Sequence, residues 1–198
     1  MDELLKSLRH FISRDLVFLI AGSIALAAFL YRFDRLPLSP PGLLVSLFLA
    51  GVSYVLGYAV QAFFSILGVV TTAQTRTPGL LTRWLYRRLT QESWHDVPAE
   101  VEMTPLVNRL DEVAQARVER RVMLKQLSAS VGPCALIAAA MLLWRFGATR
   151  DGFDLAAGLA AVLVGVTLIP VGRVAAAQEA KYYERVSREQ LAPRGIGA

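Results

Sequence analysis

The sequence is poor in the residue types on which metal sites and many active sites depend. It contains one cysteine, Cys134, and two histidines, His10 and His95, in 198 residues. A single cysteine excludes an intramolecular disulfide and a cysteine-ligated zinc or iron–sulfur site. The chain also lacks a phosphate-binding Gly-Lys loop and a Gly-x-Ser-x-Gly nucleophile turn. We therefore expect no catalytic residues, no metal and no cofactor.

Charged residues are also scarce, at 19% of the chain against about 25% in soluble domains. The chain is correspondingly apolar, with a mean hydropathy of +0.45. Four hydrophobic runs approach or exceed the roughly 20 residues that cross a bilayer core; they cover 16–31, 42–70, 129–146 and 153–171. None has a charged residue or histidine in its interior, which argues against a proton-driven pump or an ion-coupled carrier.

These runs predict an all-α integral membrane protein with four transmembrane helices arranged as two hairpins. Short connections at 36–42, which is rich in proline, and at 147–152 join the helices of each hairpin. We expect the helices that continue from the third and fourth runs to pack together outside the membrane. The expected divisions are a cytosolic N-terminal segment at 1–15, hairpins at 16–72 and 128–172, a helical cytosolic loop at 73–127, and a cytosolic C-terminal helix and tail at 173–198.

The distribution of basic residues predicts the orientation. Of the 21 Lys and Arg residues, 17 lie in the N-terminal segment, the long loop and the tail, and 4 lie near the two short connections. Basic residues collect on the cytosolic side of membrane proteins, so both termini and the loop are expected to be inside. The use of Arg over Lys, with much Ala and Gly, indicates a GC-rich bacterial genome. We thus expect a multi-pass protein of the bacterial inner membrane.

The second run carries a line of polar and small residues on an otherwise apolar helix: Ser53, Gly57, Gln61, Ser65 and Gly68. The line is either a helix-packing face, where glycine allows close approach and Ser or Gln bonds across the contact, or the lining of a pore in which Gln61 is the narrow point. In the fourth run, Gly158 and Gly165 lie seven residues apart and predict another packing face.

The long loop begins with a helix start signal, Thr77-Pro78-Gly79. In the segment that follows, the apolar residues are expected on one face and the arginines towards the other. An apolar stripe with Trp beside arginines suits a helix at a membrane surface; packing on the protein itself would bury the same stripe. The candidate membrane-surface or partner-binding residues are Arg83, Trp84, Arg87 and Arg88.

The bases of this loop alternate with acids and form no one-sided stripe, which argues against nucleic-acid binding.

Both histidines lie in patterns that resemble incomplete parts of known sites. The spacing of His10 and Asp15 resembles that of lipid acyltransferases, and Glu92 with His95 resembles half of a di-iron carboxylate site. Neither pattern has its partner motif, and solvated residues explain both. They leave a lipid-modifying membrane enzyme as a third functional hypothesis.

Two other hypotheses rank above it. The first is a non-enzymatic homo-oligomeric membrane protein, channel-like or effector-like, that is controlled through its cytosolic helices. In layout alone, the chain resembles the small multi-span subunits of bacterial anti-phage systems, such as the Kiwa membrane component, which implies a role in defence. The second is a membrane anchor or assembly subunit that recruits a cytosolic partner protein through residues 76–127. The lipid bilayer and copies of the same chain are the other expected partners.

Overall fold

The computed structural model describes residues 2–36, 39, 41–67, 69–70, 80–91, 93 and 112–191, with side chains described for 15–36, 39, 41–67, 69–70, 82–91, 93 and 120–185. All regular structure in these ranges is helical, as predicted. The helices are α1 (Asp2–Arg32), α2 (Leu43–Ile66), α3 (Leu80–Thr90), α5 (Glu112–Thr149) and α6 (Gly152–Leu191). Four of them, α1, α2, α5 and α6, are long and apolar enough to cross a membrane. Residues 94–111, between α3 and α5, lie outside the described residues.

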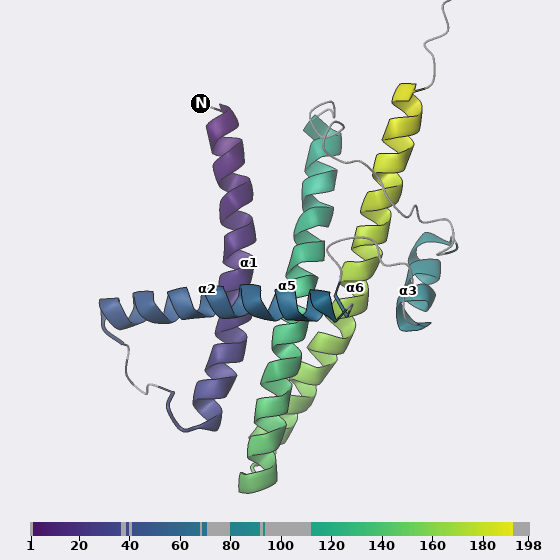
Figure 1. The fold of residues 1–198 in the computed structure, drawn as a ribbon. Coiled ribbons are helices and arrows are strands. Elements are labelled where there is room, and N and C mark those ends of the chain that lie inside the picture. The colour runs from purple at the N-terminus through teal and green to yellow at the C-terminus, as the bar shows by residue number, and fades with distance from the viewer. Residues whose placement is uncertain are drawn as a thin grey trace, which may run out of the picture.

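The longest helices, α5 and α6, form an antiparallel pair (Figure 1). The chain reverses between Thr149 and Gly152, where Arg150 adopts a left-handed conformation with φ of 58°. A row of glycines spaced seven residues apart on α6 faces α5, because a Cβ atom at Gly158 or Gly165 would come within 3 Å of a leucine side chain on α5. The predicted packing face on the fourth span is therefore confirmed, and the same row continues to Gly172, which packs against Ser128.

Each of these two helices continues past its predicted span without interruption. Helix α5 passes through Pro133 and α6 through Pro170. The extensions remain packed together, since the Arg121 guanidinium donates a hydrogen bond to the Gln178 carbonyl oxygen at 3.2 Å. The expected pairing of the two helical extensions is thus confirmed.

Helices α1 and α2 cross instead of running side by side as a hairpin would (Figure 1). Their contact is a point at which two glycines meet, Gly22 of α1 and Gly57 of α2. A Cβ atom at Gly22 would overlap the Ser53 carbonyl oxygen, and one at Gly57 would overlap the Phe18 carbonyl oxygen. The two backbones touch, which only glycine permits. The hairpin prediction rests on the short connection alone. The length of a connection carries no information about how closely the two helix backbones can approach.

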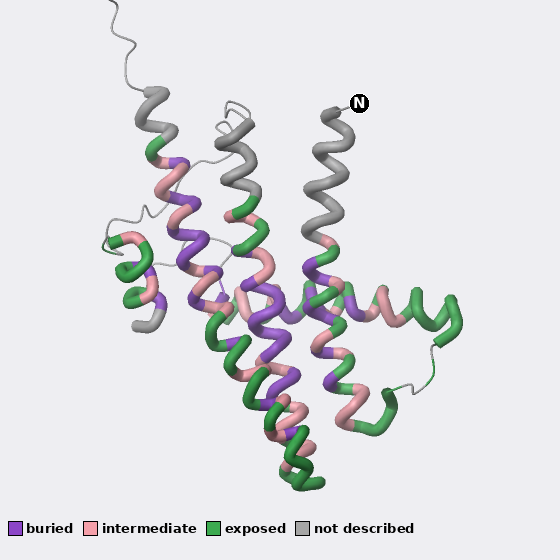
Figure 2. Tube along the Cα trace, turned by 180° about the vertical axis from the view of Figure 1, so that it is seen from behind, coloured by how far each residue is buried: buried purple, intermediate pink, exposed green. Residues whose placement is uncertain are grey.

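Burial is concentrated around this crossing and along the upper half of α6 in the view of Figure 2. The half of α2 that begins at Leu43 extends away from the other helices and is exposed (Figure 2). Exposed apolar side chains also cover the halves of α5 and α6 nearest their connecting turn, among them Trp144, Phe153 and Leu163. Exposed apolar surface of this extent is typical of membrane or protein contact regions.

Candidate functional site

The polar line on α2 lies in contacts with the neighbouring helices. Ser53 is buried at 3% exposure and Gly57 is buried against α1. Beside them, the ring of Phe18 meets the rings of Tyr54 and Tyr58 edge to face, with centroids 5.9 and 5.6 Å apart. The Tyr54 hydroxyl donates a hydrogen bond to the Asp15 carboxylate at 3.1 Å, which adds a polar contact between α2 and α1 beside the crossing.

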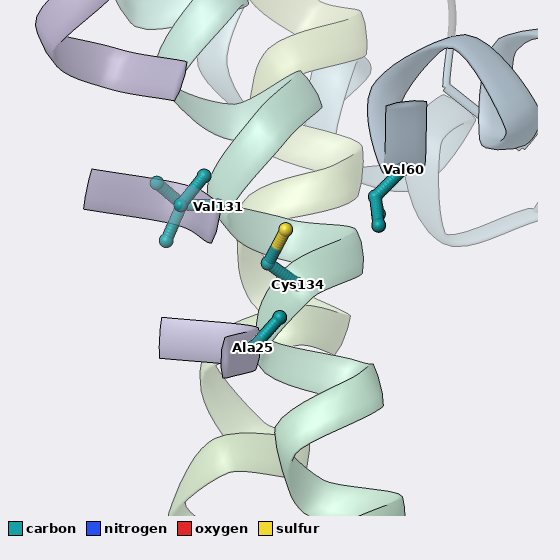
Figure 3. Close-up of a cluster of buried hydrophobic side chains, with 5 residues drawn as sticks. Ala25, Val60, Val131 and Cys134 are labelled. Atoms are coloured by element: carbon teal, nitrogen blue, oxygen red, sulfur yellow. The ribbon is translucent and has the colours of Figure 1, made fainter. Parts of the chain in front are cut away.

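Gln61 joins α2 to α5. Its side-chain oxygen accepts a hydrogen bond from the Ser130 hydroxyl at 2.5 Å. The neighbouring Val60 enters a buried apolar cluster with Ala25, Val131 and Cys134, in which α1, α2 and α5 meet (Figure 3). The lone cysteine therefore has the role of a small apolar core residue.

Two residues complete the predicted line. Ser65 is half-buried, and Gly68 lies outside the described residues. The structure thus places Ser53, Gly57 and Gln61 in contacts between helices of one chain. Sequence reasoning missed their partners, Gly22 and Ser130, because α1 and α5 each carry several small residues and nothing local marks which of them meets α2.

The predicted surface helix α3 packs on α6 through a different face from the one that its leucines suggested. Tyr86 is fully buried against Val174 and Ala177 of α6, and Thr82 is buried at 4% exposure. Trp84 is 62% exposed. Packing on the protein predicted Trp84 in the buried stripe, but the tyrosine packs there instead. The membrane-surface interpretation of Trp84 stays a prediction.

The arginines predicted on α3 are all at the surface: Arg83, Arg87 and Arg88 are exposed. Leu89 is exposed as well, at 61%, while Leu85 is partly buried beside Tyr86. The four candidate residues of this helix therefore share a surface that no other described part of the chain covers.

A buried ion pair joins α5 and α6 on their extensions. The Lys125 ammonium lies 2.5 Å from the Glu179 carboxylate, and the two side chains are 10% and 3% exposed. Glu179 follows the glycine row of α6 at the same spacing of seven, after Gly172. The ion pair was missed because the two residues are 54 positions apart; the regular spacing on α6 is the signal that could have placed Glu179 on the packing face.

A second polar network lies at the opposite end of the helices. Arg145 of α5 reaches Asp34 at 2.6 Å, Asp154 of α6 at 3.4 Å, and the Tyr31 carbonyl oxygen at the end of α1. Asp154 is fully buried and also accepts a hydrogen bond from Thr149 at 3.1 Å. Arg145 thereby ties α1 to the α5–α6 pair at the turn between these helices.

Among the described residues, no three His, Cys, Asp or Glu side chains lie close enough to hold a metal ion. Glu92 and His95 lie outside the described residues, and the side chain of His10 is not described. Neither histidine pattern is therefore tested. Comparison with protein-family models, with curated proteins and with solved structures gave no match to this chain.

Proposed function

We propose that this chain is an integral protein of the bacterial inner membrane that works without catalysis, as an anchor that presents a rigid pair of helices to a cytosolic partner protein. In this proposal α1, α2, α5 and α6 span the membrane, and both termini and residues 73–127 are inside. The excess of basic residues in these parts supports the orientation. The exposed apolar surface of the four helices supports lipid as their surroundings.

The continuity of α5 and α6 is the observation that carries the proposal. These helices have 38 and 40 residues, or about 57 and 60 Å at about 1.5 Å per residue. A bilayer core is only about 30 Å thick, so roughly half of each helix extends beyond it. The extensions share a buried ion pair, Lys125 with Glu179, and they also carry α3 through Tyr86. These two extensions, called the stalk below, are therefore fixed relative to each other. A protein that binds the stalk is held at a fixed distance from the membrane.

Two exposed apolar side chains on the stalk suit a protein partner. Met123 is 47% exposed and Leu124 is 42% exposed, next to the buried Lys125. They precede the third predicted span, which begins at residue 129, by five and six residues, or about 7.5 to 9 Å at about 1.5 Å per residue. In this orientation they lie beyond the bilayer core, at the outer edge of the headgroup zone. Large exposed apolar side chains mark a contact surface when they lie together.

Site-specific photocrosslinking tests the recruitment. A photoreactive phenylalanine is introduced in cells at Met123 or at Leu124, and at Phe153 and Leu159 as controls on the outer half of α6, where both are exposed. We expect an adduct with a soluble cytosolic protein at the first two positions and adducts only with lipid or with the chain itself at the controls. The same products at all four positions would exclude recruitment through this surface.

The assignment of α2 as a span constrains how it lies in a bilayer. Residues 33–42 connect the end of α1 to the start of α2, and lipid-exposed irregular backbone does not occur within the hydrocarbon core. The two helix ends must then lie at the same membrane face. The structure has α2 crossing α1 instead, so α2 enters this proposal as a span on its length and apolar composition alone.

Cysteine labelling tests this topology in a Cys134→Ala background. We expect Ser39→Cys and Arg150→Cys to react with a membrane-impermeant maleimide outside intact spheroplasts, and Gln91→Cys to react only after the membrane is opened. Reaction of Gln91→Cys from outside would reverse the orientation. Reaction of Ser39→Cys only after opening would exclude α2 as a span.

A homo-oligomeric, channel-like effector is the second candidate, and the free half of α2 favours it. Leu43, Leu44 and Phe48 are 76%, 82% and 69% exposed. Copies of the chain arranged about a symmetry axis would cover this surface. Particle size and ion flux in liposomes separate the candidates: a closed ring with flux supports the effector, and the absence of flux supports the anchor.

A further inference from the structure

Helix α3 has two faces of opposite character. One face holds the buried Tyr86 and Thr82 against α6. Trp84 is 62% exposed, and it lies two residues from each of these buried residues, on the other side of the helix. The ammonium of Lys181 lies 5.8 Å from the Tyr86 ring, so α6 adds a cation at the edge of the buried face. The helix is therefore fixed in orientation, and its outward face is determined by the way in which Tyr86 is buried.

The chemistry of the exposed surface is that of an anion-binding helix. Its side chains include Arg83, Arg87 and Arg88, all exposed, and the eleven residues of α3 include no acid. Guanidinium groups match phosphate oxygens with two parallel hydrogen bonds. Trp84 lies among these arginines, and tryptophan prefers the level of lipid headgroups, where its ring is half in apolar surroundings.

The position of α3 along α6 matches that level, if α6 spans the membrane as proposed above. About 20 residues cross the bilayer core, so a span that begins at Gly152 ends near Val171. The α3 contacts Val174 and Ala177 lie three and six residues further, or about 4.5 to 9 Å at about 1.5 Å per residue. The headgroup zone occupies about 5 to 8 Å on each side of the core.

We propose that α3 binds the anionic phospholipid headgroups of the cytosolic leaflet through Arg83, Trp84, Arg87 and Arg88. Tyr86 holds the helix on α6 so that these side chains face the headgroups. A lipid surface matches the observations better than a protein partner because the cations surround a single large aromatic residue at the height of the lipid phosphates. The site adds a headgroup contact to the four apolar spans and fixes the height of the stalk relative to the membrane surface.

The environment of Trp84 tests the proposal in the full-length chain. Trp94→Phe and Trp144→Phe leave Trp84 as the only tryptophan. The protein is reconstituted in vesicles of phosphatidylcholine alone or of phosphatidylcholine with a minor fraction of phosphatidylglycerol. We expect Trp84 emission to shift to the blue, and to be quenched by lipids brominated near the headgroup, when phosphatidylglycerol is present. High salt is expected to remove most of this difference, since it screens the arginines.

The matched variants separate headgroup binding from general charge effects. Arg83→Gln/Arg87→Gln/Arg88→Gln is expected to abolish the difference between the two vesicle types. Arg35→Gln/Arg150→Gln changes two exposed arginines at the other end of the molecule and is expected to preserve it. The proposal is overturned if Trp84 remains equally accessible to iodide in both vesicle types. It is also overturned if protection from iodide depends on protein concentration, which would identify a second copy of the chain as the occupant. Labelling of Gln91→Cys separately reports whether α3 lies on the cytosolic side.

Discussion

Gly22 and Gly57 face each other where α1 crosses α2, and neither position has room for a methyl group. A Cβ atom at Gly22 would lie 2.7 Å from the Gly57 amide nitrogen, and one at Gly57 would lie 3.0 Å from the Gly22 amide nitrogen. The first helix pair is therefore held by backbone contact, with aromatic side chains at its edges.

Gly57→Ala is expected to destabilise the protein by about 1 to 3 kcal/mol, the usual cost of inserting a methyl group into a tight contact. The obstacle is the Phe18 carbonyl oxygen, which belongs to a helix backbone and cannot rotate away. Thermal unfolding in detergent measures the effect. Gly51→Ala is the control, because this position on the same helix has no atom within 4 Å of the added carbon. Equal melting temperatures for the two variants would contradict the crossing.

Removal of one partner from the Lys125–Glu179 ion pair is expected to be more damaging than removal of both. Lys125→Met leaves a carboxylate that is 3% exposed without its counter-ion, which costs roughly 3 to 5 kcal/mol when a buried pair is broken. Lys125→Met/Glu179→Leu removes both charges and is expected to recover most of this loss. The prediction is tested by measuring the free energy of unfolding of the unchanged protein, the single variant and the double variant. If the double variant is as unstable as the single variant, then the uncompensated charge of Glu179 is not the cause of the loss, and the prediction is wrong.

Gln61 and Ser130 are expected to show energetic coupling without any effect on ion flux. Their hydrogen bond of 2.5 Å joins α2 to α5, and such bonds between membrane helices contribute about 0.6 to 1.7 kcal/mol. A double-mutant cycle with Gln61→Leu and Ser130→Ala measures the coupling. In parallel, Gln61→Leu is assayed for flux in liposomes. A changed flux, with additive effects on stability, would favour the pore interpretation over packing.

Arg145→Met is expected to destabilise the protein by about 3 kcal/mol, at the lower end of the range for a broken buried pair. The loss leaves the fully buried Asp154 without a cation, whereas the other carboxylate partner, Asp34, is 80% exposed and contributes little. Arg150→Met is the matched control because Arg150 is exposed, and its cation lies 5.8 Å from the Phe146 ring. Thermal unfolding of both variants tests this; similar losses would show that Asp154 is stabilised by other groups.

Much of the fold could be predicted from local patterns. The four apolar helices follow from hydropathy over stretches that approach or exceed the length needed to cross a bilayer core, and this property does not depend on what lies beside them. The packing role of Gly158 and Gly165 follows from the spacing of small residues, because residues seven apart recur on one face of a helix. The surface position of the three arginines of α3 follows from the cost of burying a charge.

The contacts between helices were decided only by the tertiary structure. Hydropathy makes Trp84 and Leu89 at least as suitable for burial as Tyr86, but in the structure Tyr86 packs against Val174 and Ala177 of α6 and the other two are exposed. The choice of Ser130 as the partner of Gln61 likewise depends on where α5 stands relative to α2.

The amino-acid sequence by itself thus determined the all-helical fold class, the four long apolar helices and the polar line along one of them, since each depends on residues close together in the chain. The tertiary structure decided that α2 crosses α1 at Gly22, that Lys125 meets Glu179, and that α3 turns Trp84 outward. These relationships join residues far apart in the chain. They depend on how closely backbones and side chains fit, which no periodicity encodes.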